Sequence, residues 1–337
     1  MVRDLEEEGM LELLSDGHAG HMDALVSPQN EYLCLTRLAE LDTKLITRDI
    51  GKQIEEERVL RSAGAKEFTY DAYHELDVIY EHLVTMGTAH SDIATTFDLP
   101  GTTHEGRVIK AVRITKDIEN SAGDKPLVWI DGGIHAREWV SISTVTYIID
   151  TLLGEQEPDK SEEIAALLEK FQFVIAPCVN PDGYVHSQID RLWRKNRKPS
   201  GCRRGEENWY GGCFYEQCFG ADPNRNWGPQ DIWNTTGVSS DPCSLVYTGT
   251  APFDQPCTEI LKNYLTEQKD KLKLYLSFHS YSQLFLTPVG YDSDFTPPES
   301  ARHARIGAAV VEAIMARHGT EYKAMKMSEL YAARWKI

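Results

Sequence analysis

The chain has 337 residues, enough for about two domains and a sizeable hydrophobic core. It carries 35 Lys and Arg against 52 Asp and Glu, so its formal net charge is −17, which makes nucleic acid and anionic membrane surfaces poor partners. No apolar run approaches the roughly 18 residues that cross a bilayer, so we expect no membrane span. The first residues, Met1 to Glu8, are polar and acidic, unlike a secretory signal.

In chain order, the first 61 residues show three short elements. Apolar residues predict a strand over 22–26 and an amphipathic helix over 30–41, and a charged run predicts a helix over 53–61. The small residues of 62–65 follow and are typical of an exposed linker that a protease can cut.

Beyond residue 65, strands and helices alternate. Helical spacing predicts a helix over 70–86, and alternation predicts a half-buried strand over 107–114. The apolar runs 127–130 and 171–176 are typical of central strands, with a helix predicted between them over 140–153. A further apolar strand begins at Leu272. This βαβ rhythm predicts an α/β fold.

Cysteines gather in one loop-rich stretch. Four of the seven lie there: Cys202, Cys213, Cys218 and Cys243. Their clustering favours disulfide bonds and an oxidising compartment, which the sequon at Asn234 also favours. Zinc binding is the alternative interpretation, but the spacings lack the paired C-x2-C units of structural zinc sites. We expect Cys34, Cys178 and Cys257 to be free thiols.

The segment from Asp131 to Trp139 is the sharpest chemical motif. It contains His135 and Glu138, three residues apart and directly after a predicted strand. If this segment opens the helix, both side chains lie on one face of one turn and can bind the same zinc ion. A surface helix pair is the alternative for an isolated H-x-x-E, but ligands of open α/β sheets gather at the carboxyl ends of strands.

A catalytic zinc needs a third protein ligand. His279 is the best candidate, because it also follows an apolar strand. The other histidines lie in helical or loop contexts, where a structural role is the simpler interpretation. Asn224 and Arg225 place an amide beside a guanidinium, and further arginines lie around Arg194. An arginine with a neighbouring amide can bind a carboxylate, although an isolated arginine more often forms a structural ion pair.

Together these motifs resemble the zinc carboxypeptidases of the pancreatic A/B type, which are secreted as proenzymes. The resemblance runs from Met22 to Tyr331. It implies a mixed-sheet α/β/α catalytic domain over 62–337 and, over 1–61, an α+β ferredoxin-like prosegment, both shorter than in the family. It also implies activation by a trypsin-like protease after Arg61.

The resemblance implies one Zn²⁺ ion bound by His135, Glu138 and His279. Asp222 matches the carboxylate that orients the first histidine, and Arg194 matches the arginine that stabilises the oxyanion. Asn224 and Arg225 match the pair that binds the terminal carboxylate of the substrate.

Further positions follow from the same resemblance. Arg137 matches a residue on the path of the peptide, and Tyr331 matches the tyrosine that caps the substrate. Gly290 matches a position where glycine favours removal of hydrophobic or aromatic residues. The resemblance pairs Cys218 with Cys243, and Cys202 then pairs with Cys213.

The family pattern continues past the capping tyrosine to a Phe-Glu-Leu-Arg segment whose glutamate is the general base. The printed sequence ends at Ile337 without this glutamate. Loss of a general base slows a reaction by about 10²- to 10⁴-fold, so we expect impaired hydrolysis. The alternative function is that of a non-catalytic protein that binds zinc and peptide C-termini.

The resemblance also implies the setting of the protein. Expected partners are peptides or proteins with a free C-terminus and the activating protease, with no nucleic acid and no membrane. We expect a secreted, extracellular monomer, although the chain carries no recognisable signal peptide.

Overall fold

The computed structural model describes residues 2–14, 22–63, 67–121, 124–202, 213, 217–230, 233, 237–292 and 294–332. The chain divides into two compact units: one comprises Ile54–Ser280, and the other comprises Met1–Gln53 together with Tyr281–Ile337. This division differs from the predicted domain boundary at Arg61, which stays a prediction. Within the described ranges, no helix has both the length and the apolar character to cross a membrane.

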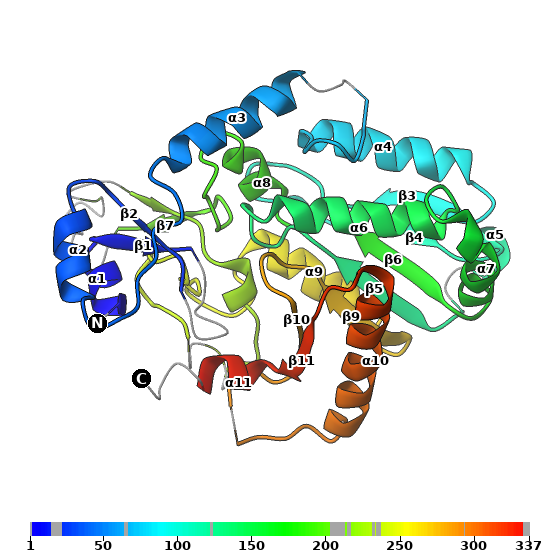
Figure 1. Ribbon diagram of the computed structural model, residues 1–337. Helices are drawn as coiled ribbons and strands as arrows, with labels where there is room; N and C mark the ends of the chain where they lie inside the picture. The colour runs from blue at the N-terminus through cyan, green and yellow to red at the C-terminus, as the bar shows by residue number, and fades with distance from the viewer. Residues whose placement is uncertain are drawn as a thin grey trace. The chain divides into compact units, whose positions relative to one another are not determined.

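A five-stranded mixed sheet forms the centre of the unit Ile54–Ser280 (Figure 1). In spatial order its strands are β3 (Ala94–Asp98), β4 (Lys110–Ile114), β6 (Gln172–Ala176), β5 (Leu127–Asp131) and β9 (Leu272–Ser277). β4 is antiparallel to β3 and β6, whereas β5 is parallel to both β6 and β9. The predicted α/β class with a mixed sheet is therefore confirmed.

Alternate residues of the strands pack on opposite faces of this sheet, as a period of two requires. One face, with Val128 and Ile130, packs against α4 (Leu76–Ala89), α6 (Trp139–Leu152) and α7 (Ser161–Lys170). The other face, with Leu127 and Trp129, packs against α9 (Pro256–Glu267). Both faces of β5 and β6 are buried, so these strands are apolar apart from one polar residue at an end of each, Asp131 in β5 and Gln172 in β6.

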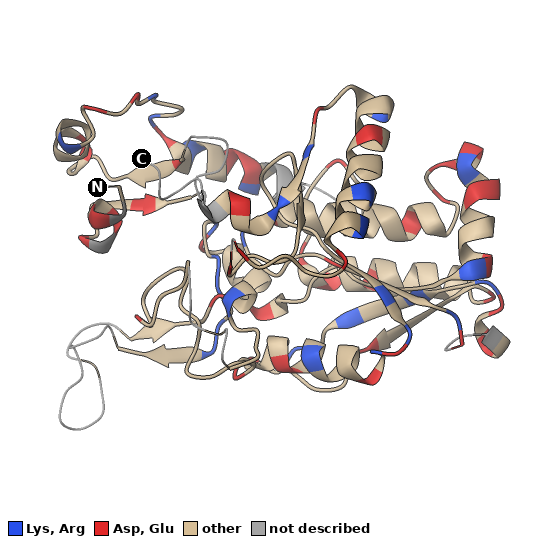
Figure 2. Ribbon diagram, turned by 90° about the horizontal axis from the view of Figure 1, so that it is seen from below, with Lys and Arg blue, Asp and Glu red and all other residues tan. Residues whose placement is uncertain are grey.

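Short elements complete this unit. They are α5 (Ile118–Ser121), η1 (Pro158–Lys160), α8 (Pro181–Ser187), β7 (Pro199–Gly201), β8 (Cys218–Phe219) and η2 (Pro223–Arg225). Figure 2 shows acidic and basic positions interspersed along the helices, while most of the strand surface is uncharged.

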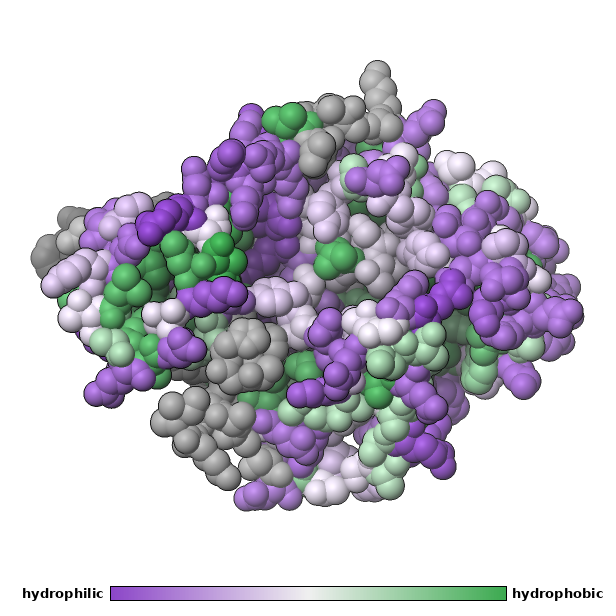
Figure 3. Space-filling model, viewed as in Figure 1, coloured by the Kyte–Doolittle hydropathy of each residue, from purple (hydrophilic) through white to green (hydrophobic). Residues whose placement is uncertain are grey.

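The second unit combines both ends of the chain. Its elements are α1 (Val2–Glu7), β1 (Leu11–Leu13), β2 (Ala24–Val26), α2 (Glu31–Arg37), β10 (Leu284–Thr287), α10 (Ser300–His318), β11 (Lys323–Lys326) and α11 (Met327–Ala332). β1 pairs antiparallel with β2, and β10 pairs parallel with β11. Leu5, Leu11 and Cys34 form a small core, and Figure 3 shows apolar side chains at the surface of the N-terminal elements. Helix α3 (Ile50–Ala63) begins in this unit and ends in the other.

Two predicted helices have different ends in the structure. The helix expected over 70–86 begins at Leu76, because tertiary contacts hold the residues before it: the Tyr70 hydroxyl donates to Asp150, and the Thr69 N–H donates to His74. The helix expected over 30–41 ends at Arg37. The strand expected from residue 107 begins at Lys110.

The cysteines form the expected kinds of group. Disulfide bonds join Cys202 to Cys213 and Cys218 to Cys243, the pairs that the resemblance implied. Buried free thiols are found at Cys34, Cys178 and Cys257. The sequon residue Asn234 lies outside the described residues.

Candidate metal centre

The ends of two adjacent parallel strands bring the predicted ligands together. His135 follows the end of β5 by four residues, and His279 follows the end of β9 by two. Because β5 and β9 run parallel, their carboxyl ends lie at the same edge of the sheet. This topology places two histidines side by side although they are 144 residues apart in the chain.

The prediction that His135 and Glu138 share a helical turn is wrong. Both residues lie in the tight connection between β5 and α6, and Glu138 has non-helical backbone angles at the N-cap position. Glycines allow the connection to turn: Gly133 has a φ of +65°, and a Cβ on Gly132 would lie 2.8 Å from the Ser141 carbonyl oxygen. The turn still keeps the two side chains together, because the Glu138 N–H donates to the His135 carbonyl.

The distances between ligand atoms suit a zinc ion. His135 Nδ1 lies 2.7 Å from Glu138 Oε1, and His279 Nδ1 lies 3.1 Å from Glu138 Oε2 and 3.2 Å from His135 Nδ1. One ligand atom from each of the three residues lies within 4.8 Å of the other two. Zinc bonds of about 2.0–2.1 Å at tetrahedral angles separate neighbouring ligand atoms by roughly 3.3 Å, so this donor set fits the metal.

Burial and charge act in opposite directions on these groups. Burial raises the pKa of the Glu138 carboxyl, but His135 and His279 outweigh it, so the net shift is downward. Burial lowers the pKa of His279, but the Glu138 carboxylate outweighs it, so the net shift is upward. Glu138 therefore stays anionic, as a metal ligand must be.

Asp222 lies behind the first histidine and is fully buried. Its Oδ1 lies 3.1 Å from His135 Nε2, and its Oδ2 accepts from Arg194 Nε at 3.1 Å and Nη2 at 2.8 Å. Burial raises the pKa of Asp222, but Arg194, His135 and Arg225 together hold it well below its usual range. A charged acceptor at Nε2 favours a proton on that nitrogen, which makes Nδ1 of His135 the nitrogen that could bind a metal ion.

The predicted carboxylate-binding pair follows Asp222 directly. Asn224 and Arg225 lie in η2, whose first turn is capped because the Asp222 side chain accepts from the Asn224 N–H at 2.9 Å. Arg225 Nε donates to the Gly237 carbonyl at 3.1 Å. Arg137 lies inside the metal motif, and its Nη1 donates to the Leu192 carbonyl at 3.4 Å.

The other predicted site residues lie elsewhere in the chain. Gly290 follows β10 in the unit that holds both chain ends, and the backbone of Tyr331 lies in α11 of the same unit. Arg61 lies in the last turn of α3. The side chains of Tyr331 and Arg61 lie outside the described residues, and the roles of all three residues stay predictions.

Comparisons with known proteins agree with this geometry. The family model described as zinc carboxypeptidase matches residues 79–336. The chain belongs to the zinc carboxypeptidase family. It is 34% identical to zinc carboxypeptidase A 1 of Drosophila melanogaster, covering 96% of this chain and 72% of the relative. It is 36% identical to carboxypeptidase B of Astacus astacus, covering 78% of this chain and 80% of the relative.

Solved structures show the same fold. The crystal structure of the carboxypeptidase A from Helicoverpa armigera matches with a TM-score of 0.80 and 26% identity, covering 98% of this chain and 78% of that one. The fold of this zinc carboxypeptidase is thus shared over nearly its whole length.

Some contacts of this zinc carboxypeptidase were not predicted. The Ser280 N–H donates to Glu138 Oε2 at 3.0 Å, so the backbone after His279 also positions the carboxylate. Arg191 Nη1 donates to the Arg137 carbonyl at 2.7 Å, and its guanidinium lies 3.8 Å from the centre of the Trp139 ring. Asp131 closes β5 as a buried carboxylate. The sequence signal that could have singled out Asp131 is a charged residue at the end of an apolar run.

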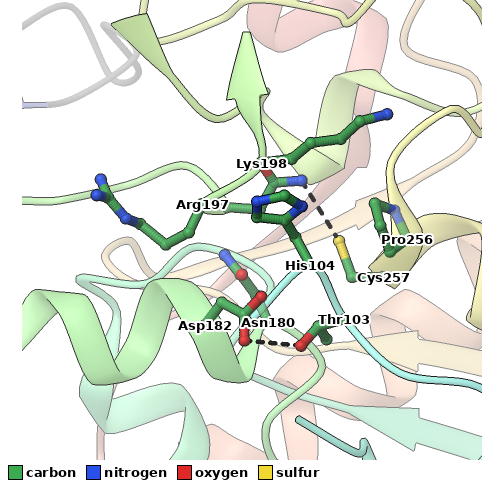
Figure 4. Close-up of a pocket in the computed structure, with 9 residues that line it drawn as sticks. Thr103, His104, Asn180, Asp182, Arg197, Lys198, Pro256 and Cys257 are labelled. Atoms are coloured by element: carbon green, nitrogen blue, oxygen red, sulfur yellow. Dashed lines mark hydrogen bonds between the residues drawn. The ribbon is translucent and has the colours of Figure 1, made fainter. Parts of the chain in front are cut away.

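A polar pocket in the same unit is a separate feature (Figure 4). Asp182 accepts there from the Thr103 hydroxyl at 2.7 Å, and the Asn196 amide donates to Cys257 Sγ at 3.8 Å. The cavity measures about 10 Å³, room for about one water molecule. It is too small for a substrate side chain, so the metal centre remains the candidate functional site.

Proposed function

We propose that this chain binds one Zn²⁺ ion through His135, Glu138 and His279 and hydrolyses the last peptide bond of peptides and proteins. The observation that carries the proposal is the cluster of three ligand atoms from two adjacent strand ends. Asp222 supports it, because a buried carboxylate behind His135 has the position of a group that orients a metal ligand. The family supports the metal and the reaction class.

The neighbouring residues account for selection of the chain end. Asn224 and Arg225 present an amide and a guanidinium to the terminal carboxylate of a substrate, a pairing that favours a planar anion. Arg194, held by two hydrogen bonds that it donates to Asp222, stabilises negative charge on the oxygen of the scissile bond. A bound zinc ion supplies Lewis-acid polarisation of that carbonyl. Arg137 lines the approach, Tyr331 caps the substrate, and Gly290 favours hydrophobic or aromatic terminal residues.

We further propose that residues 1–61 act as a prosegment that a trypsin-like protease removes after Arg61. An ion pair supports a docked α3: Glu57 Oε1 accepts from Arg191 Nε at 2.6 Å, and Arg191 in turn contacts the Arg137 backbone. Two disulfide bonds support secretion into an oxidising compartment. The monomeric state is part of the same proposal.

A binding protein without turnover is the second candidate. Among the described residues, the carboxylates with contacts to the cluster are Glu138 and Asp222, and both are engaged, by the histidines and by Arg194. Neither is available as a general base without giving up these contacts. Such a protein retains zinc and C-terminus recognition but hydrolyses about 10²- to 10⁴-fold more slowly than a complete enzyme.

Zinc stoichiometry and peptide hydrolysis test the proposal together. We expect one zinc per chain by elemental analysis and loss of this zinc in His279→Ala, whereas His318→Ala, an exposed control in α10, keeps it. Absence of stoichiometric zinc in the wild type contradicts the site. Release of C-terminal residues after cleavage at Arg61, abolished by His279→Ala, supports the enzyme, and zinc binding with peptide binding but no release supports the second candidate.

A further inference from the structure

Asp131 is a buried carboxylate that the proposed mechanism does not use. It ends β5 and is 0% exposed. Its Oδ2 accepts from Trp129 Nε1 at 2.6 Å, and its Oδ1 accepts from the Ser277 hydroxyl at 2.6 Å. Burying a charged group costs free energy unless hydrogen bonds compensate for it, so the buried carboxylate of Asp131 calls for an explanation in terms of a role.

Strand pairing fixes Asp131 relative to the second histidine loop. Asp131 lies opposite Ser277 in the register of β5 and β9, and the Phe278 N–H donates to the Asp131 carbonyl at 2.8 Å. Ser277 is the last residue of β9, and His279 follows two positions later. The pairing of β5 with β9 therefore places the Asp131 carboxylate, the Ser277 hydroxyl and the His279 ring next to one another.

The Ser277 hydroxyl connects Asp131 with His279. Its Oγ lies 3.4 Å from His279 Nε2, at the long end of the hydrogen-bond range. A carboxylate only accepts hydrogen bonds, so the Ser277 hydroxyl must donate its proton to Asp131. Its oxygen can then only accept from His279, which requires a proton on Nε2. In a neutral imidazole, a proton on Nε2 leaves Nδ1 as the bare nitrogen, and Nδ1 is the atom that faces Glu138.

We propose that Asp131, acting through Ser277, is a positioning pair that holds His279 as the Nε2–H tautomer with Nδ1 directed at the metal. This inference rests on the proposed zinc site. His135 supports it by comparison, because its Nδ1 also faces the cluster while its Nε2 lies 3.1 Å from a buried carboxylate, Asp222. Each histidine thus has a carboxylate behind it, one in direct contact and one through a hydroxyl.

The two arrangements differ in how firmly they hold the ring. Asp222 contacts His135 directly, and the His135 side chain is 4% exposed, whereas the His279 side chain is 34% exposed. Fewer protein atoms pack against a more exposed ring, so the orientation of such a ring depends more on its hydrogen bond. His279 is therefore the ligand whose tautomer the Ser277 hydroxyl controls.

The test compares Ser277→Ala and Ser277→Thr with the wild type in the full chain. Zinc affinity is measured by competition with a chelator. Groups behind metal ligands contribute about 10- to 100-fold in affinity, so we expect Ser277→Ala to weaken zinc binding by that factor and Ser277→Thr, which keeps the hydroxyl, to stay within about threefold of the wild type. Thermal unfolding of the zinc-free proteins checks that both variants fold.

The Nε2 proton itself provides a readout that a purely structural role of Ser277 would not change. In ¹⁵N-labelled protein, long-range ¹H–¹⁵N spectra should show a proton on His279 Nε2 that exchanges slowly with water in the wild type and in Ser277→Thr, and faster in Ser277→Ala. If Ser277→Ala does not fold, Ser277→Cys keeps the volume with a weaker hydrogen-bonding group and should also show the faster exchange.

The outcomes separate this inference from the proposed function. A folded Ser277→Ala with zinc affinity within twofold of the wild type, or an unchanged exchange rate of the Nε2 proton in Ser277→Ala or Ser277→Cys, overturns the positioning role while the zinc site stands. A wild type that binds no stoichiometric zinc overturns the proposed function, and the exchange rates of the Nε2 proton in the zinc-free protein still decide whether Ser277 holds the His279 ring.

Discussion

Glu57 and Arg191 form an ion pair between α3 and the loop after α8, with 2.6 Å between Glu57 Oε1 and Arg191 Nε. Arg191 also stacks on Trp139 and donates to the Arg137 carbonyl, so the pair links α3 to the backbone of the metal motif. The pair is partly exposed, with side-chain exposures of 32% for Glu57 and 18% for Arg191. A partly exposed pair is worth about 0.2–1 kcal/mol.

Loss of this ion pair should make α3 easier to cleave. We expect Glu57→Gln to increase the rate of tryptic cleavage after Arg61 by up to about fivefold, the factor that corresponds to the upper end of the free energy of the pair. Gel analysis with mass spectrometry of the fragments measures the rate. Glu55→Gln is the matched control, because Glu55 pairs with Arg58 within the same helix. Equal rates for the two variants would show that the ion pair does not restrain α3.

Asp222→Asn should weaken both zinc binding and the fold. The substitution removes the charge that Arg194 and His135 share and takes from the buried Arg194 guanidinium a carboxylate that lies 2.8 Å from it. We expect zinc affinity to fall about 10- to 100-fold and the free energy of unfolding to fall by about 3–5 kcal/mol. Chelator competition and urea unfolding measure the two effects. The control is Asp270→Asn, at an exposed position. If Asp222→Asn is as stable as this control, the ion-pair argument is contradicted.

Lys195 should give the protein an unusual dependence on alkaline pH. The side chain is 3% exposed, its Nζ donates to the Pro242 carbonyl at 2.8 Å, and desolvation, partly opposed by Asp222 and Asp241, lowers its pKa to about 8. Between pH 8 and the ordinary value near 10.5, the unfolded chain binds more protons than the folded chain, so this lysine makes stability rise with pH. Its contribution over that window is on the order of 3 kcal/mol.

A comparison of Lys195→Met with the wild type isolates this effect. Burial raises the pKa of the Cys257 thiol to about 11, and that group changes stability in the opposite direction over part of the same window. Because Cys257 is present in both proteins, its contribution cancels in the difference. We expect urea unfolding at pH 7.5 and pH 10.5 to show the larger increase in stability for the wild type. Identical pH profiles for the two proteins would rule out a depressed pKa at Lys195.

Zinc removal should lower the thermal stability of the protein. A ligand that binds only the folded state at 100 times its Kd stabilises that state by about 2.7 kcal/mol. We expect a chelator to lower Tm in the wild type, and we expect no such change in His279→Ala, which lacks a ligand. Calorimetry with and without the chelator measures both values. An equal decrease in Tm in both proteins would mean that the chelator acts somewhere other than the three-residue cluster.

The central strands were predictable because strands buried on both faces consist mostly of apolar residues. Leu127 to Ile130 is an apolar run, Phe171 to Ala176 is apolar apart from Gln172, and each run coincides with a strand of the sheet. The start of α4 was not predictable, because the Tyr70–Asp150 hydrogen bond joins residues 80 positions apart. The spacing of apolar residues along the chain does not reveal such a contact.

The candidate site shows the same division. His135, Glu138 and His279 could be singled out because each follows a recognisable strand, and the structure brings their ligand atoms together. The sequence suggested a helical turn for His135 and Glu138, but the glycines before them make a tighter connection. The contribution of Ser277 depends on the register of β5 and β9, which a single sequence does not specify.

The separation of 144 positions between the two histidines gives the proposed metal centre a topological consequence. An ion held by His135 and His279 ties two distant points of the chain together, as a disulfide does, and makes the segment between them a closed ring. That ring contains α6, α7, β6, α8 and α9. An unfolded chain could keep the ion only by closing this long ring, an entropic cost that grows slowly with length, so unfolding releases the ion. An ion bound at the proposed site would thus act as a reversible cross-link that stabilises the folded sheet unit, in addition to any part it has in the reaction.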